Sequence, residues 1–320
     1  MSEALRYLPC ADQRAIADAF NDSVRALLPL ERFHGPRGES DQTWAQLDDI
    51  GLFSIAVPEN AGGSGLGAAE EALIAMELGR CLADPSVLAT IGVTHALPRL
   101  QEGSAIGKRT AAGYRAGGRC ILVADSGAEQ VLLRSHDEAW LCPYPPDAKE
   151  LDDGLWDARL ECCGPPDPEA VQFDPAGILR LRLNDAAALA GISAQALEMG
   201  VAYAKERHQF GRPIGSFQAV KHHCANMAIG ARNAGDQVAF AAVAIDERQQ
   251  DAELQVDCAL LVAGMAALRN SGLNIQVHGG IGFSEEAYPH LLLKRSQVLV
   301  AIAGGLEAAN ARIAVACHGR

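Results

Sequence analysis

Apolar residues follow helical spacing through the first hundred positions of the chain. Ile16, Phe20, Val24 and Leu27 recur every three or four residues and predict a helix over 11–28. The same spacing predicts a short helix over 44–50 and two longer ones over 68–81 and 86–99. We therefore expect an N-terminal α-helical domain over residues 1–100.

The helical pattern stops between residues 101 and 181. Short apolar runs appear instead over 120–124, 130–134 and 139–142, and prolines and glycines separate them. This texture predicts a reduced β domain of five to seven short strands over residues 101–181.

Helical spacing returns in the last part of the chain. One helix is predicted from about residue 184, with Asp185 as its N-cap, and a second begins after Ser216 as its cap. A third covers 254–268, and residues 286–316 supply one or two more. Residues 182–320 are thus expected to form a C-terminal four-helix bundle. The predicted fold class is mainly α with a small β domain.

A glycine-rich segment, Gly63 to Ala68, formally fits a dinucleotide-binding fingerprint. That fingerprint has meaning only between a strand and a helix of a parallel sheet. Here the next helix leads to another helix and no sheet pattern develops. We interpret the segment as a turn into a helix.

Composition narrows the class of protein. The 320 residues carry a formal net charge of −13, which argues against a nucleic-acid partner because such binding neutralises phosphates with clustered cations. No run of 18 or more apolar residues occurs, so we expect no membrane span. The first residues lack the apolar core of a signal peptide. The nine cysteines form no CxxC pair, which favours reduced thiols in a cytoplasmic protein and no metal site.

The densest positive segment of this acidic chain spans residues 203–223. Its four Lys and Arg residues (Lys205, Arg207, Arg212 and Lys221) outnumber the single acid Glu206, which leaves about +3 locally. Pro213 and two glycines interrupt the helix between them. The segment is either a basic, aromatic-tipped loop that meets an anionic partner or a solvated turn with ordinary surface charge.

This segment resembles the helix-loop-helix signature of acyl-CoA dehydrogenases, flavoenzymes that desaturate acyl-CoA thioesters between Cα and Cβ. A second segment, Gln276 to Phe283, is similar to that family's other characteristic motif, and the two lie in the family's order and at about its spacing. The resemblance covers roughly residues 41–100 and 182–315. It is weak over 1–40 and poor over 101–181.

The resemblance implies an FAD site and assigns residues to it. Arg207 would reach across a subunit interface to the FAD pyrophosphate, and a guanidinium can fork onto two phosphate oxygens. A surface ion pair with Glu206 or another acid is the alternative for Arg207. His278 has a structural role at a helix end in this interpretation. The residues expected to contact the cofactor are Arg207, Gln209, Phe210, Gln218, Gln276, Gly279 and Gly280.

Two features depart from the family's pattern. The family's larger middle domain carries a Thr-Glu-Pro motif and a Trp-Ile-Thr or similar motif that contact the flavin, and this sequence contains neither. The family's catalytic base, a glutamate, is also missing. Its two usual positions correspond here to Ala303 and Leu181. The nearest acids to consider are Glu285, Glu286 and Glu307, which we interpret first as surface acids.

The run from Gly279 to Ser296 is similar to a subset of the family. These are shortened subunits that pair with a different subunit into heterotetramers, several of them in steroid side-chain degradation. The resemblance implies an FAD-dependent acyl-CoA dehydrogenase subunit that works with a homologous partner or with itself in a dimer or tetramer. An acyl-CoA thioester would be its substrate and an electron-accepting flavoprotein its redox partner. The alternatives are a non-catalytic scaffold subunit that completes a partner's site and a flavoprotein without dehydrogenase chemistry.

Overall fold

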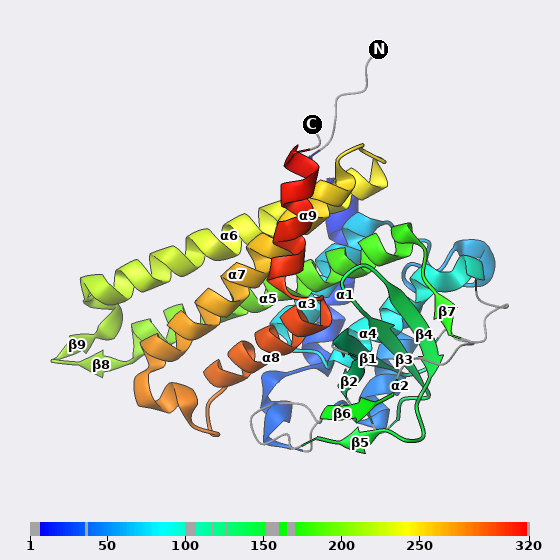
Figure 1. Cartoon of the computed structure of the whole chain (residues 1–320). Helices are drawn as coiled ribbons and strands as arrows, with labels where there is room; N and C mark the ends of the chain where they lie inside the picture. The colour runs from blue at the N-terminus through cyan, green and yellow to red at the C-terminus, as the bar shows by residue number, and fades with distance from the viewer. Residues whose placement is uncertain are drawn as a thin grey trace, which may run out of the picture.

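The computed structural model describes residues 7–35, 38–99, 107–116, 118–123, 125, 127–151, 160–164 and 170–318. Long helices of the second half of the chain extend to one side, and the N-terminal helices and a β-sheet lie together on the other (Figure 1). The architecture is mainly α with a small sheet, as the sequence predicts.

The four helices predicted in the N-terminal part are confirmed. They are α1 (Ala11–Leu27), α2 (Asp41–Asp49), α3 (Ala68–Arg80) and α4 (Pro85–Val93). Helix α4 begins where its sequence requires, because the Asp84 side chain accepts a hydrogen bond from the Ser86 amide at 3.0 Å and Pro85 occupies the first turn. The helix is shorter than predicted, since residues 94–99 form a 3₁₀ segment.

The middle of the chain forms one sheet of seven strands among the described residues. The strands are β1 (Thr110–Ala116), β2 (Arg119–Val123), β3 (Gln130–Arg134), β4 (Ala139–Pro143), β5 (Lys149–Glu150), β6 (Leu160–Cys163) and β7 (Val171–Gln172). Their order is β5-β6-β2-β1-β3-β4-β7. Only the β1–β3 pair is parallel.

The sheet buries apolar side chains on both faces. On one face, Ala112, Leu132 and Leu141 share a core with residues of the helical part of the chain. On the other face, Leu122 and Leu133 form a separate small core that includes buried cysteines. The first face joins the sheet to the helices, so any cleft between sheet and bundle must lie there.

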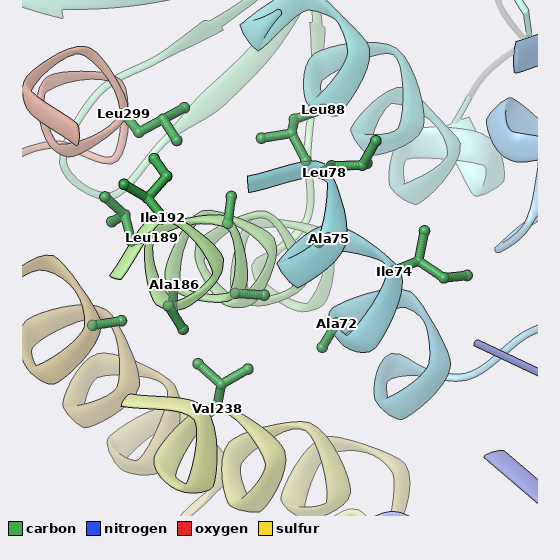
Figure 2. Packing of buried hydrophobic residues seen from close by; sticks show 14 of the residues in the cluster. Ala72, Ile74, Ala75, Leu78, Leu88, Ala186, Leu189, Ile192, Val238 and Leu299 are labelled. Atoms are coloured by element: carbon green, nitrogen blue, oxygen red, sulfur yellow. The ribbon is translucent and has the colours of Figure 1, made fainter. Parts of the chain in front are cut away.

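Helix α5 (Pro175–Glu206) runs through the centre of the molecule. It packs against α3 and against the other long helices, as the labelled side chains around it show (Figure 2). Every residue from 181 to 193 on this helix is buried. The remaining helices are α6 (Gln218–Asp246), α7 (Ala252–His278), α8 (Pro289–Ile302) and α9 (Leu306–His318).

Two glycines allow α3 and α5 to cross at close range. A Cβ at Gly191 would overlap the carbonyl oxygen of Met76, and one at Gly79 would overlap that of Ala188. The backbones therefore touch directly, which only glycine permits. This crossing fixes the N-terminal helices against the bundle.

The start of α5 corrects one expectation. The helix begins at Pro175, and its N-cap is Asp174, whose carboxylate accepts from the Gly177 amide at 2.7 Å. Asp185 is a buried residue in the interior of the helix and not a cap. The expected division between residues 181 and 182 falls inside α5, and we propose to place the domain boundary before Pro175.

The start of α6 corrects a second expectation. The helix begins at Gln218, and the N-cap position is Phe217, which provides no side-chain cap. Ser216 instead ends the preceding 3₁₀ segment Ile214–Ser216. Its hydroxyl therefore lies one residue before the position from which it could cap the helix.

One helical stretch among the described residues, Ala252–Phe283, is long and apolar enough to cross a membrane by length and composition. However, 56% of its most apolar window is buried inside the chain. That burial is typical of the core helix of a bundle, and α7 packs along both α5 and α6.

Candidate active site

The two segments that the sequence singled out lie at one end of the bundle. A hairpin of β8 (His208–Gln209) and β9 (Arg212–Pro213) follows α5, and the 3₁₀ segment Gly279–Phe283 follows α7 (Figure 1). The Tyr203 ring of α5 stacks on the His278 ring of α7, with ring centroids 4.1 Å apart. This contact joins the two segments, which are far apart in the sequence.

The hairpin presents an aromatic tip and a basic side chain. Phe210 and Gly211 both have left-handed backbone conformations, with φ of 51° and 76°, which makes the sharp reversal. Phe210 is 91% exposed. The Arg212 guanidinium lies 4.2 Å from the centroid of the Phe217 ring, a cation–π arrangement that holds it against the hairpin base.

Arg207 connects α5 to the hairpin. Its amide donates to the Tyr203 carbonyl at 2.8 Å, and its own carbonyl accepts from the Ile214 amide at 2.8 Å, so the backbone is held on both sides. The side chain is exposed. Among the described residues, no carboxylate lies within ion-pair distance of it, which leaves its charge available to an outside anion. The alternative of an internal ion pair with Glu206 therefore finds no support.

The second segment exposes backbone. Gln276 points outward from α7, and Gly279 has a positive φ of 65°. A Cβ at Gly279 or Gly280 would meet no atom within 4 Å, so a ligand could approach this backbone closely. The residues that the sequence assigned to the cofactor are all exposed: Arg207, Gln209, Phe210, Gln218, Gln276, Gly279 and Gly280.

This arrangement can hold a negatively charged dinucleotide at the surface. Arg207 offers a permanent charge, Phe210 an apolar wall and Gly279–Gly280 an open backbone. These groups fit the pyrophosphate and adenosine part of FAD.

The two usual positions of the family's base are both buried, although they lie far apart in the sequence. Leu181 and Ala303 are each 3% exposed. Leu181 and Ile302, the neighbour of Ala303, line one cavity between the sheet and the bundle. Its volume is about 20 Å³, which is room for about one water molecule. The lining residues are Pro85, Leu88, Ala89, Ala112, Leu132, Arg134, Leu181, Asn184, Asp185, Leu299 and Ile302.

An internal ion pair occupies the polar side of this cavity. Arg134 of β3 and Asp185 of α5 lie 2.6 Å apart, and both are buried. Burial raises the pKa of Asp185, and the charge and hydrogen bond of Arg134 offset part of that rise. Sequence reasoning missed this acid because it assigned Asp185 to a helix cap.

A second buried carboxylate lies next to the cavity. The Asn184 amide donates to Glu71 of α3 at 2.5 Å, and His95 and Arg180 contact the same carboxylate. Burial by itself would raise the pKa of Glu71, but the charges of His95 and Arg180 and the hydrogen bonds of His95 and Asn184 lower it well below its usual range. Glu71 is therefore ionised and fully engaged.

The turn between β3 and β4 is fastened to the bundle beside Ala303. Arg182 donates to the His136 carbonyl at 3.1 Å and to Asp137 at 2.9 Å. Arg312 of α9 forks onto Asp257 of α7, with distances of 2.8 to 3.0 Å. Arg182 thus holds the turn against α5, and Arg312 joins the same turn to α7 because it also lies 3.4 Å from Asp137.

The three acids considered as replacements for the base lie elsewhere. Glu285, Glu286 and Glu307 are exposed, and none lines the cavity that Leu181 shares with Ile302.

Across the described ranges, no group of three or more His, Cys, Asp or Glu side chains is placed to hold a metal ion.

Comparison with known proteins agrees with this architecture. Residues 11–108 match the acyl-CoA dehydrogenase N-terminal domain, and residues 176–317 match the acyl-CoA dehydrogenase C-terminal domain. The helical domain, small sheet and bundle are thus the fold of acyl-CoA dehydrogenases.

Individual acyl-CoA dehydrogenases are also similar to this chain. The chain is 30% identical to acyl-CoA dehydrogenase IpdE2 of Mycobacterium tuberculosis over 86% of this chain and 84% of that protein. It is 32% identical to acyl-CoA dehydrogenase FadE34 of the same organism, over 82% of this chain but only 40% of FadE34. One chain of the ChsE4-ChsE5 complex from M. tuberculosis has a similar fold, with a TM-score of 0.78 and 22% identity over 98% of this chain and 99% of that chain. The chain belongs to the acyl-CoA dehydrogenase family.

Proposed function

We propose that this chain is a subunit of an FAD-dependent acyl-CoA dehydrogenase that performs α,β-dehydrogenation together with a partner subunit. One observation carries the proposal: the seven expected cofactor residues lie exposed around the joined ends of α5 and α7. When bound, FAD supplies the hydride acceptor for such a reaction. Members of the family use this cofactor, and the fold of the chain is theirs.

Arg207 has the central binding role in this proposal. Its guanidinium would neutralise and orient the pyrophosphate, with Gln209 and Gln218 as polar neighbours. Phe210 would exclude water from one side of the adenosine. Gly279 and Gly280 would let backbone amides approach the ligand.

The partner subunit is required for two reasons. The exposed cofactor residues form one wall only, and the positions of the base, Ala303 and Leu181, cannot accept a proton. One chain of the ChsE4-ChsE5 complex has this fold, and that complex supports a heteromeric assembly here. A cytoplasmic location, a homologous partner and an electron-accepting flavoprotein complete the proposal.

The test is the flavin content of the assembled complex. The chain is purified with its candidate partner, and flavin absorbance is measured relative to protein absorbance. Arg207→Ala should weaken FAD binding about 10- to 100-fold, because a hydrogen bond to a charged group contributes about 1.5–3 kcal/mol. Arg232→Ala is the matched control, since Arg232 is an exposed arginine of α6 that pairs with Asp236 on the same helix. Equal flavin content in wild type and Arg207→Ala would refute the proposal.

A second candidate function is a non-catalytic scaffold subunit that completes the partner's site. The observation that favours it is the cavity at Leu181, which has room for about one water and not for a thioester. Equilibrium dialysis with acetoacetyl-CoA separates the two functions. If the chain is a scaffold, the isolated chain should bind no acetoacetyl-CoA, and Arg207→Ala should still lower the flavin content of the complex. A catalytic subunit binds the thioester by itself.

A further inference from the structure

Two cysteines face each other on neighbouring strands of the sheet. Cys120 of β2 is directly opposite Cys163 of the antiparallel strand β6. Directly opposite residues have Cα atoms about 4.5–5.5 Å apart. Disulfides span Cα separations of about 4.4–6.8 Å. The backbone therefore already has a spacing that a disulfide can bridge.

The two thiols also lie on the same face of the sheet. Cys120 belongs to the small core of the outer face, and Cys163 packs against that core. A hydrogen bond between the two side chains contributes to the pKa values of both. The neighbouring Cys162 is opposite Ile121 and so points to the other face. Cys142 lies on β4, and β1 and β3 separate that strand from β2.

Only one of the two thiols has a route to solvent. Cys120 is 0% exposed, whereas Cys163 is half-buried and lines a pocket with Tyr144 and Asp147. An oxidant would reach Cys163 first. The buried Cys120 would then be the resolving thiol.

We propose that Cys120 and Cys163 form a reversible disulfide when the protein meets a peroxide. The Cys163 thiol releases its proton to solvent, and the thiolate attacks hydrogen peroxide to give a sulfenic acid and hydroxide. The hydroxide takes up that proton and forms one water. The Cys120 sulfur then attacks the Cys163 sulfur, the S–S bond forms and the hydroxyl leaves as a second water. Two thiols lose two electrons in total, and one peroxide is reduced to two waters. A dithiol reductant reverses the reaction.

The reaction has a pH signature. Burial raises the pKa of both thiols and brings that of Cys163 to about 12. Around the pair, Asp147 and Cys162 also raise the pKa of Cys163, whereas Arg115 lowers that of Cys120. Because the thiolate is the reactive form, the oxidation rate should rise about tenfold per pH unit between about pH 7 and 9.

The disulfide would change the sheet itself. It ties β6, and β5 beside it, to β2 by a covalent bond. A cross-link that restricts the unfolded chain stabilises the folded one. We therefore expect the oxidised protein to melt several degrees higher than the reduced protein.

The experiment uses the full purified chain without FAD or partner, since the proposal depends on neither. The chain is treated with hydrogen peroxide at two pH values, free thiols are blocked with N-ethylmaleimide, and peptides are mapped by mass spectrometry without reduction. The expected product is one peptide pair joined through Cys120 and Cys163 that disappears after dithiothreitol. It should form faster at the higher pH.

Single substitutions identify which two cysteines form the disulfide. Cys120→Ser and Cys163→Ser should each abolish the linked pair, and Cys120→Ala tests the same point if a buried serine unfolds the sheet. Cys162→Ser is the matched control, adjacent in sequence but on the other face, and it should leave the product unchanged. A dominant link to Cys162 or Cys142, a link that persists in Cys120→Ala, or oxidation of Cys163 to sulfinic acid alone would overturn the proposal.

Discussion

The ring centroids of Tyr203 and His278 lie 4.1 Å apart at an interplanar angle of 23°, and this stacking holds the end of α5, from which the β8–β9 hairpin follows, against the end of α7. The Nδ1–H of His278 donates to the Asn274 carbonyl at 2.9 Å, which fixes the ring. Burial lowers the pKa of His278, and the hydrogen bond to Asn274 opposes this in part. The imidazole is therefore neutral at pH 7.

Replacing His278 with alanine should loosen the hairpin. An aromatic pair contributes about 0.5–1.5 kcal/mol beyond its buried area, so FAD affinity of the complex should fall by up to about tenfold. Flavin absorbance and thermal melting measure the two effects. His222→Ala, an exposed histidine of α6, is the control. Unchanged flavin content in His278→Ala would separate the stack from the cofactor site.

The same residue predicts a pH dependence. The folded pKa of His278 lies below the unfolded value of about 6.5, so the unfolded chain binds more protons in this window. Stability therefore falls as the pH drops below about 6.5. The slope of melting temperature against pH in that window should be smaller in His278→Ala than in the wild type.

Glu71 predicts a large effect on stability. Its carboxylate is 1% exposed and is surrounded by His95, Arg180 and Asn184. Glu71→Gln removes the buried charge that pairs with the partly buried Arg180, which costs up to about 3–5 kcal/mol. Chemical denaturation of the two proteins measures the difference. Glu198→Gln removes an exposed acid from an ion pair with Arg80 and should cost less than about 1 kcal/mol.

Acid unfolding should also depend on Glu71. Its pKa is lowered in the folded state, so the unfolded chain takes up the proton first as the pH falls. The stability from this group is complete above the unfolded pKa of about 4.3 and is lost below it. Glu71→Gln should therefore show a shallower loss of stability below about pH 4.5. An identical acid profile in both proteins would contradict this assignment.

The helices could be predicted from the local pattern of apolar residues. The positions of the buried charged side chains in the fold could not. Helical spacing located α1 to α3 because a buried face repeats every three to four residues. Asp174 and Asp185 are equally good caps by composition. Only the tertiary contact with Arg134 shows that Asp185 belongs inside the helix. The sequence carries no signal of that contact, because β3 and α5 are separated by the rest of the sheet.

Part of the candidate site could likewise be predicted from the sequence, and part depends on tertiary packing. The residues proposed to bind the cofactor, such as Arg207 and Gln276, lie in two continuous motifs, so the sequence alone suggests them. The cavity depends on Leu181 and Ile302, which meet only because α5 packs against α8. Its size is set by the side chains of several elements together. The motifs locate Ala303 and Leu181 as the positions where the family's base is expected, but they do not show how little space the surrounding side chains leave there.

Two aspartates near the turn between β3 and β4 differ in burial, and we expect their replacement to change stability by different amounts. Asp257 is 2% exposed and receives the fork of Arg312, whereas the Asp137 side chain, which also contacts Arg312 and Arg182, is 68% exposed. Asp257→Asn should cost about 3–5 kcal/mol, and Asp137→Asn no more than about 1 kcal/mol. Urea denaturation of both variants tests this. Equal costs would mean that the turn between β3 and β4 is not held through Asp257.

The last prediction concerns the missing base. A positioned general base contributes about 10²- to 10⁴-fold to a rate, so Ala303→Glu should restore turnover if only the base were absent. The cavity beside it leaves room for about one water, and the Arg134–Asp185 pair fills its polar side. We therefore expect the wild-type chain alone to be a poor dehydrogenase and Ala303→Glu to gain less than about tenfold.

A dye-reduction assay with a panel of acyl-CoA and steroid-CoA thioesters measures this turnover, first on the chain alone and then with the partner. Melting temperature and flavin content show that the variant is folded and loaded. Ala308→Glu, a half-buried position on α9 outside the cavity lining, is the matched control for an added acid. A gain of more than a hundredfold in Ala303→Glu alone would show that a thioester enters this cavity.

Glu285, Glu286 and Glu307 are exposed, so their replacement by glutamine should leave the activity of the complex unchanged. A large loss of activity at any of them would identify the base.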